Sequence, residues 1–204
     1  GDSYALRRVS RATGRMTTVA NLAFPVALLP LPDGKLLVSR SQVVPATVER
    51  FDPASGSSSL VAGGGTSAIG DGGPATSAVL AGAVSVSASP DGSVLVTESA
   101  GRRVRTFRTG GPIRTVAGNG LGGVPVEGVP ATSSPLSPAA ALTRADGTTF
   151  ISANSLVLEV DGATGLLTRL AGGGSSDPGD GGPARSAQLR IPDGLALDGD
   201  SGLL

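Results

Sequence analysis

A regular internal repeat constrains the fold of this chain more than any single motif does. One five-residue phrase recurs in the forms TTVAN, SLVAG, RTVAG and TRLAG, at residues 17–21, 59–63, 114–118 and 168–172. A second phrase, a PDG or ADG turn followed by an apolar run, keeps the same order at residues 32–38, 90–96 and 145–151. Self-similarity at a fixed period indicates an architecture in which each repeat is one supersecondary unit.

The first period is shorter than the others because it lacks an insert. The insert reads GDGGPATSA at residues 70–78 and GDGGPARSA at residues 179–187, with a degenerate middle copy, GVPATS, at residues 128–133. Proline is tolerated in the first turn of a helix and alanine is a good helix former. We therefore expect a single helical turn at residues 74–80 and another at residues 183–189.

Within one period the local signals predict four strands. Alternating small and apolar residues, separated by turn signals, predict strands at residues 83–89, 93–99, 103–107 and 113–117. The Pro90-Asp91-Gly92 turn joins the first two, with glycine where a positive φ is wanted. The third strand is expected to place its polar side chains on one face and Val104 and Phe107 on the other.

A repeating unit of four strands predicts an all-β fold, a β-propeller of four-stranded antiparallel blades. A β-sandwich has no reason to repeat. The repeats predict one domain over residues 1–204, an open arc of three complete blades and two partial ones: 1–20 (partial), 24–63, 82–118, 137–172 and 190–204 (partial). Propellers usually need four to eight blades for closure, so we expect the chain to be a fragment of a longer propeller.

Composition removes most common enzyme mechanisms. The chain has no His and no Cys, so it has no imidazole base, thiolate nucleophile, zinc knuckle or disulfide. Sixteen basic residues balance sixteen acidic ones, which disfavours a polyanionic partner. No stretch approaches the ~18 apolar residues of a membrane helix, so no membrane insertion is expected. We expect no cofactor, and the compartment stays open.

The order of motifs in the best-preserved period resembles NHL repeats. A PDG turn is followed by VLVTES, GRRVR and IRTVAGNG, and the GDGGPATSA insert resembles one NHL subgroup. The period at residues 137–172 departs from the pattern, with NSLVL in place of the arginine run. The resemblance implies a non-enzymatic binding scaffold, chiefly for protein partners and in some members for carbohydrate or RNA.

Two groups of charged residues are candidate sites. Asp71 and Asp180, on glycine-rich loops, offer carboxylate oxygens to Ca²⁺. The alternative is that each aspartate caps the following turn. The arginines of the best-preserved period suggest a basic rim patch for an acidic partner, and the alternative is a solvated strand face: Arg102, Arg103, Arg105 and Arg108.

One enzymatic alternative remains, a fragment of a six-bladed, metal-dependent propeller lactonase or lyase. Its candidate ligands, by residue type only, are Glu98, Asn119, Asn154 and Asp198. These residues do not occupy equivalent positions in the repeats. Lyases similar to NHL proteins rely on histidines, which this chain lacks. We therefore predict that the chain is not an enzyme.

Overall fold

A computed structural model describes residues 4–41, 45–66, 68–177, 179–199 and 202–204. The predicted all-β class is confirmed: the described chain consists of antiparallel sheets, and its only helices are three short 3-10 turns. None of these turns is a candidate for crossing a membrane. Residues 1–3, 42–44, 67, 178 and 200–201, which belong to the predicted blades and the segments between them, lie outside the described residues.

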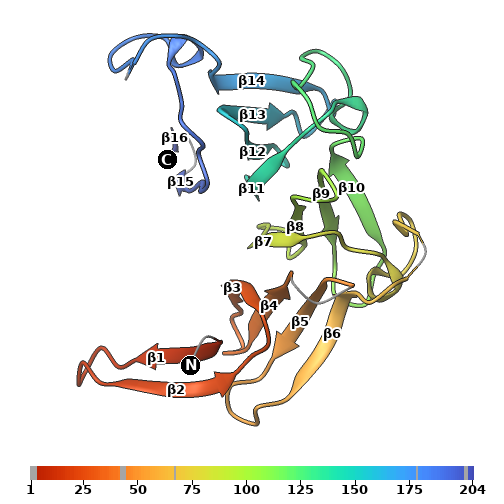
Figure 1. Ribbon diagram of the computed structural model, residues 1–204, viewed down its shortest axis with the longest axis vertical. Helices are drawn as coiled ribbons and strands as arrows, with labels where there is room; N and C mark the ends of the chain where they lie inside the picture. The colour runs from red at the N-terminus through yellow and green to blue at the C-terminus, as the bar shows by residue number, and fades with distance from the viewer. Residues whose placement is uncertain (1–3, 42–44, 67, 178, 200–201) are drawn as a thin grey trace.

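Three four-stranded sheets and two two-stranded sheets follow one another along the chain (Figure 1). The first blade comprises β3 (Pro25–Pro30), β4 (Leu36–Arg40), β5 (Thr47–Phe51) and β6 (Ser58–Gly63). The second comprises β7 (Ala83–Ala88), β8 (Val94–Glu98), β9 (Arg103–Phe107) and β10 (Ile113–Ala117). The third comprises β11 (Pro138–Thr143), β12 (Thr149–Ala153), β13 (Leu156–Val160) and β14 (Leu167–Gly172). The short sheets pair β1 (Ala5–Val9) with β2 (Met16–Asn21), and β15 (Leu197–Asp198) with β16 (Gly202–Leu203).

Local turn chemistry sets the register of each blade. Gly92 has φ +82°, the left-handed conformation that glycine adopts at least cost, and it joins β7 to β8. The Asp91 carboxylate accepts a hydrogen bond from the Ser93 amide (3.0 Å), which fixes the same turn. Asp33 and Asp146 accept the equivalent bonds in the other two blades. The PDG and ADG phrases therefore start every blade with the same hairpin.

The blades stand side by side around an open arc, with their first strands innermost (Figure 1). Strand β7 contacts both β3 and β11, so the inner strands lie next to one another. Valine, leucine and alanine side chains fill the spaces between neighbouring blades, as Leu37 and Val96 do on one side of the second blade and Leu95 and Ile151 on the other. Blade-on-blade packing is thus mainly aliphatic, and the buried Phe107 adds an aromatic ring to it.

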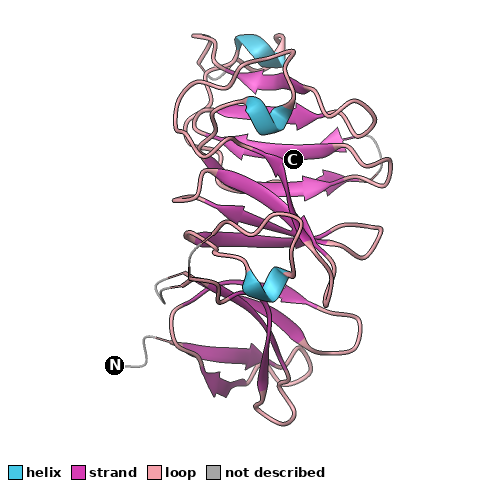
Figure 2. Ribbon diagram, turned by 90° about the vertical axis from the view of Figure 1, so that its right-hand side faces the viewer, coloured by secondary structure: helices cyan, strands magenta, loops and turns pink. Residues whose placement is uncertain are grey.

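The inserts fasten each blade to the next. They are the first (residues 64–82), second (119–137) and third (173–189), and carry the helical turns η1 (Ala75–Ser77), η2 (Ala131–Ser133) and η3 (Ala184–Ser186). The expected turns after Pro74 and Pro183 are confirmed. Figure 2 shows the three turns following one another along the outer side of the arc.

The first two inserts make the same backbone hydrogen bonds to the outer strand of the blade that follows. Gly72 N–H binds Ile113 O (2.9 Å), and Ile113 N–H binds Gly73 O (3.0 Å). In the second insert, Gly128 N–H binds Leu167 O (2.8 Å) in the same way. The inserts therefore cover the outer edges of β10 and β14, which would otherwise present unpaired backbone groups.

Candidate functional site

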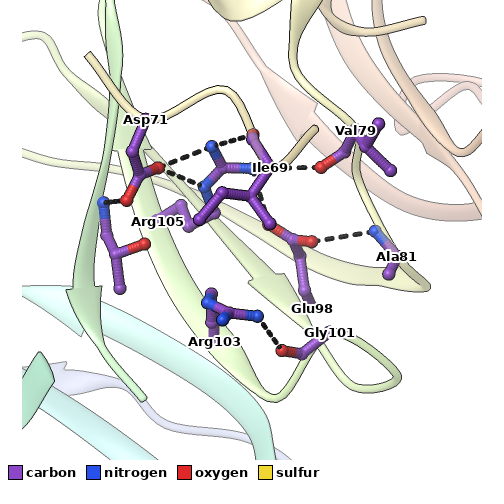
Figure 3. Close-up of polar contacts among 9 residues, drawn as sticks. Ile69, Asp71, Val79, Ala81, Glu98, Gly101, Arg103 and Arg105 are labelled. Atoms are coloured by element: carbon purple, nitrogen blue, oxygen red, sulfur yellow. Dashed lines mark hydrogen bonds and ion pairs between the residues drawn. The ribbon is translucent and has the colours of Figure 1, made fainter. Parts of the chain in front are cut away.

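Arg105, in the middle of β9, is the most deeply buried charged side chain of the described chain (Figure 3). Its Nε and Nη2 atoms donate to Asp71 Oδ1 at 3.0 and 2.6 Å, and its Nη1 atom lies 3.3 Å from Glu98 Oε1. Two backbone carbonyls of the first insert, those of Ile69 (2.6 Å) and Val79 (3.1 Å), accept its remaining hydrogen bonds. Arg105 therefore ties the first insert to the second blade.

The expected face of this strand was wrong. Side chains alternate along a strand, so Arg105 points to the same side as Phe107, and Val104 to the other. All three are buried, because both faces of the blade are covered. Arg105 is neither part of an exposed rim patch nor on a solvated strand face. The buried charge is tolerated because each donor group of the guanidinium has a partner.

The two carboxylates of this cluster have opposite pKa shifts. Burial raises the pKa of Glu98 and outweighs the hydrogen bond from the Ala81 amide (2.8 Å) and the attraction of Arg105. Burial also acts to raise the pKa of Asp71, but hydrogen bonds from Thr115 and Arg105 outweigh it and hold that pKa below its usual value. Asp71 is therefore the firmly ionised partner of Arg105.

Asp71 does not cap the helical turn that follows it. The residue before η1 is Pro74, and no side chain caps the turn. Asp71 Oδ2 instead accepts the backbone N–H of Thr115 in the outer strand (3.1 Å). Since its other oxygen binds Arg105, the interactions seen here are those of a structural link.

Glu127 occupies in the second insert the position that Asp71 has in the first, and it was not among the candidate residues predicted from the sequence. Its carboxylate accepts the N–H of Arg169 (3.0 Å), the counterpart of Thr115, and pairs with Arg185 from the third insert. An acid directly before Gly-x-Pro in all three inserts was the available signal. In the third insert this acid is Asp180, which is exposed and has no partner among the described residues.

The other three arginines of the predicted patch each contact a different part of the chain. Arg102 donates to Ser137 Oγ (2.7 Å), and Arg103 donates to the carbonyls of Gly101 (2.9 Å) and Asn119 (3.1 Å). Arg108 is exposed and pairs with Asp91 (2.7 Å) on the rim that carries the hairpin turns. The four arginines therefore do not form a single exposed basic patch.

The candidate ligands of the enzymatic alternative are engaged in structural contacts or lie at the end of the arc. Glu98 is buried against Arg105. Asn119 binds the backbone of its own insert at Leu121 (2.9 Å) and Ser133 (3.0 Å). Asn154 donates to Gly123 O (3.4 Å), and Asp198 belongs to the terminal strand β15. In the described ranges, no three acidic side chains come together as a metal site would require.

Among the openings and exposed apolar groups of the described surface are two features next to the second insert or the second blade. One is a cleft of about 290 Å³ between the second and third blades, lined in part by Asp91, Thr106 and Arg144. The other is the tip of the second insert, where three apolar side chains are exposed: Leu121 (65%), Val124 (79%) and Val126 (48%). Neither feature includes a member of the buried Arg105 cluster, although Thr106 adjoins Arg105 in β9.

Solved structures that resemble this chain settle the fold. An auxiliary nutrient binding protein from Bacteroides thetaiotaomicron aligns with a TM-score of 0.72 and 14% identity, over 98% of this chain and 49% of its own. The chain has a β-propeller fold. A virginiamycin B lyase from Staphylococcus aureus (TM-score 0.52, 11% identity, 82% of this chain and 48% of its own) is also similar. So is a gluconolactonase from Xanthomonas campestris (0.51, 18%, 80% and 54%).

This propeller chain spans about half the length of those proteins. At such low identities the likeness concerns the fold alone, and the named proteins include both binding proteins and enzymes. No protein-family model matches the chain. No curated protein matches it either.

Proposed function

We propose that this chain is an NHL-type propeller segment that serves as a non-enzymatic binding scaffold for a protein partner. The observation that carries the proposal is the tip of the second insert. Leu121, Val124 and Val126 are exposed within six residues of one another, on a loop between two described blades. Exposed apolar groups gathered in one place, rather than scattered singly, mark interaction surfaces.

A group of three exposed apolar side chains occurs in the second insert and not in the described parts of the other two. The matching stretch of the first insert has one, Ile69 (48%), and the third reads GGSSD from residue 173. The tip is nevertheless held in shape: Leu136 N–H binds Leu121 O (3.0 Å), and Val126 N–H binds Ser134 Oγ (2.8 Å). A preformed loop loses less conformational entropy on binding, which favours affinity.

Charge supports a protein partner with acidic groups beside its apolar contact. Arg102 and Arg103 are half-buried at the base of the second insert. Arg102 lies against the backbone of Gly122, and Arg103 against that of Gly120. Arginine beside apolar anchors is typical of the centre of protein interfaces.

A photo-crosslinking residue placed at Val124 tests the proposal. In extracts of the source organism we expect one protein to be crosslinked from Val124 and none from Thr109, an exposed turn residue used as the matched control. With that protein purified, Leu121→Ser and Val124→Ser together should weaken binding by about tenfold or more, a loss of ~1.4 kcal/mol or more. An affinity unchanged by these substitutions contradicts the proposed surface.

A separate assay addresses the enzymatic alternative. The intact chain, supplied with Ca²⁺, Mn²⁺ or Mg²⁺, should neither hydrolyse simple lactones nor cleave virginiamycin B above the rate of a Glu98→Gln, Asn154→Ala variant. Metal-dependent turnover that this variant loses would overturn the scaffold proposal, whatever the crosslinking shows.

A further inference from the structure

The aspartate of each hairpin turn pairs with an arginine, but the arginine comes from a different place in each blade. In the first blade it is Arg50 of β5, which reaches Asp33. In the second it is Arg108, in the loop after β9, which binds Asp91 on the outside. In the third it is Arg144, at the end of β11, which binds Asp146 (2.6 Å).

This change of position opens the space between the second and third blades. Thr106 is the counterpart of Arg50, and Ser89 is the counterpart of Leu31, because β9 aligns with β5 and β7 with β3. Two long side chains of the first blade are thus replaced by two short ones in the second. The cleft of about 290 Å³ lies where the longer pair would extend.

Hydroxyl groups dominate the polar lining of this cleft. The second blade contributes Ser89, Ser93 and Thr106, and the third contributes Thr143 and Thr149. The Ser89 hydroxyl is buried with no hydrogen-bond partner in the described chain, and no described residue bonds to that of Thr106. Thr143 and Thr149 bond only to each other through their hydroxyls (3.0 Å). Each hydroxyl can both donate and accept, so the lining retains capacity of both kinds.

The charged groups at the cleft balance one another. Hydrogen bonds from Ser93 hold the pKa of Asp91 below its usual range, and Arg108 neutralises that carboxylate. The pKa of Asp146 is lowered by its hydrogen bond from Arg144, so this pair is also neutral overall. Arg144 lies over the Phe150 ring, 5.5 Å from its centre, which keeps the guanidinium at the rim. A charged ligand would gain no unpaired counter-ion here.

We infer that the cleft between the second and third blades binds a small, uncharged, polyhydroxylated molecule such as a single sugar ring or a short polyol. Its volume of about 290 Å³ lies just below the ~300–1,000 Å³ of small-molecule pockets, which suits one ring. Ligand hydroxyls would exchange hydrogen bonds with Thr106 and the Thr143–Thr149 pair. Leu95, Val116 and Pro90 would pack against the C–H groups of the ligand. This site is separate from the apolar tip of the second insert and does not depend on the protein partner proposed there.

The test is an NMR titration of the ¹⁵N-labelled chain with a defined panel of probes. The neutral members are D-glucose, D-galactose, N-acetyl-D-glucosamine and myo-inositol, and the charged counterparts are D-glucuronate and D-glucosamine. We expect at least one neutral probe to bind with a dissociation constant on the order of 1 mM, about −4 kcal/mol. The shifted amides should be those of Ser93, Thr106 and Thr149.

Two variants decide where the probe binds. Thr106→Arg restores the residue of the first blade, fills the cleft and should weaken binding by at least about tenfold. Thr168→Arg adds the same side chain on an exposed position of β14 and should leave binding unchanged. The inference is overturned if no neutral probe shifts these amides, if a charged counterpart binds more tightly, or if Thr106→Arg binds as the parent chain does while both variants retain its spectrum elsewhere.

Discussion

One pair of positions, one in the second strand and one in the third strand of each blade, holds a different combination of residues in each of the three blades. In the second blade it holds Glu98 and Arg105, fully buried. In the first blade the charges are reversed, with Arg40 in β4 and Glu49 in β5 (3.0 Å). In the third blade the pair is apolar, Ala153 and Leu158. A place that accepts either order of charges, or none, serves packing rather than the recognition of a common ligand.

The inserts explain why the charged pair is completely buried in the second blade and not in the first. No insert precedes the first blade, since β2 ends at Asn21 and β3 begins at Pro25. Its arginine, Arg40, keeps a buried Nε atom without a partner in the described chain. In the second blade, the first insert supplies Asp71 and two carbonyl oxygens to Arg105. A charged residue can thus be fully buried where the repeat brings enough acceptors with it.

Removing Arg105 should have the largest effect on stability. Arg105→Ala leaves Glu98 buried without a counter-charge, and we expect a loss of about 3–5 kcal/mol in the free energy of unfolding, measured by urea denaturation. The double variant Glu98→Ala, Arg105→Leu copies the third blade and should recover most of that loss. Equal losses for the single and the double variant would contradict this account of the pair.

The next effect contrasts the acids of the first two inserts. Asp71→Asn weakens a carboxylate that serves a buried guanidinium, and we expect a cost of about 1–3 kcal/mol. Glu127→Gln affects partners that are partly exposed, Arg169 and Arg185, and should cost below about 1 kcal/mol. Hydrogen exchange should show the Thr115 amide losing more protection in the first variant than the Arg169 amide loses in the second. The reverse order would show that the inserts are not held as described.

Acidification should reveal the opposite pKa shifts in the cluster. The folded pKa of Asp71 is lowered, so its contribution to stability is present above its ordinary value of 3.8 and is lost as the pH falls through the folded value. The folded pKa of Glu98 is raised above 4.5, so protonation of Glu98 favours the folded state. It therefore opposes any loss of stability at a pH above the one at which Asp71 is protonated.

We therefore expect little loss of stability between pH 7 and about pH 4.5, and a steeper loss below about pH 4. The urea midpoint, measured across this range, should fall less steeply below about pH 4 in Asp71→Asn than in the parent chain. If the two fall equally steeply, the acid sensitivity comes from other carboxylates.

The strand positions could be predicted from the sequence because turn signals and alternation are local. Residues 103–107 were predicted as a strand, and β9 has those bounds. The burial of Arg105 could not be predicted in that way, since its partner Asp71 is 34 residues away and joins it only when the insert folds onto the blade. Comparing the inserts with one another would have located Glu127, whose role depends on its place in the repeat rather than on the surrounding motif.

The cleft between the second and third blades also depends on a comparison between repeats. No local pattern singles out Thr106 or Ser89, and short polar residues on strands are common. Aligning Thr106 with Arg50, and Ser89 with Leu31, shows that two short side chains stand where the first blade has two long ones. Absent side-chain volume between two packed blades is a property of the assembled fold.

The smallest effect is expected for Arg108, which the sequence places in the same run of arginines as Arg105. Its side chain is 62% exposed and that of Asp91 is 58% exposed, so water screens their pairing. Arg108→Ala should change the free energy of unfolding by less than about 1 kcal/mol, in the same urea assay that reports the loss for Arg105→Ala. If the two substitutions cost the same, burial would not be what separates them, and the contrast between the buried and the exposed arginine would fail.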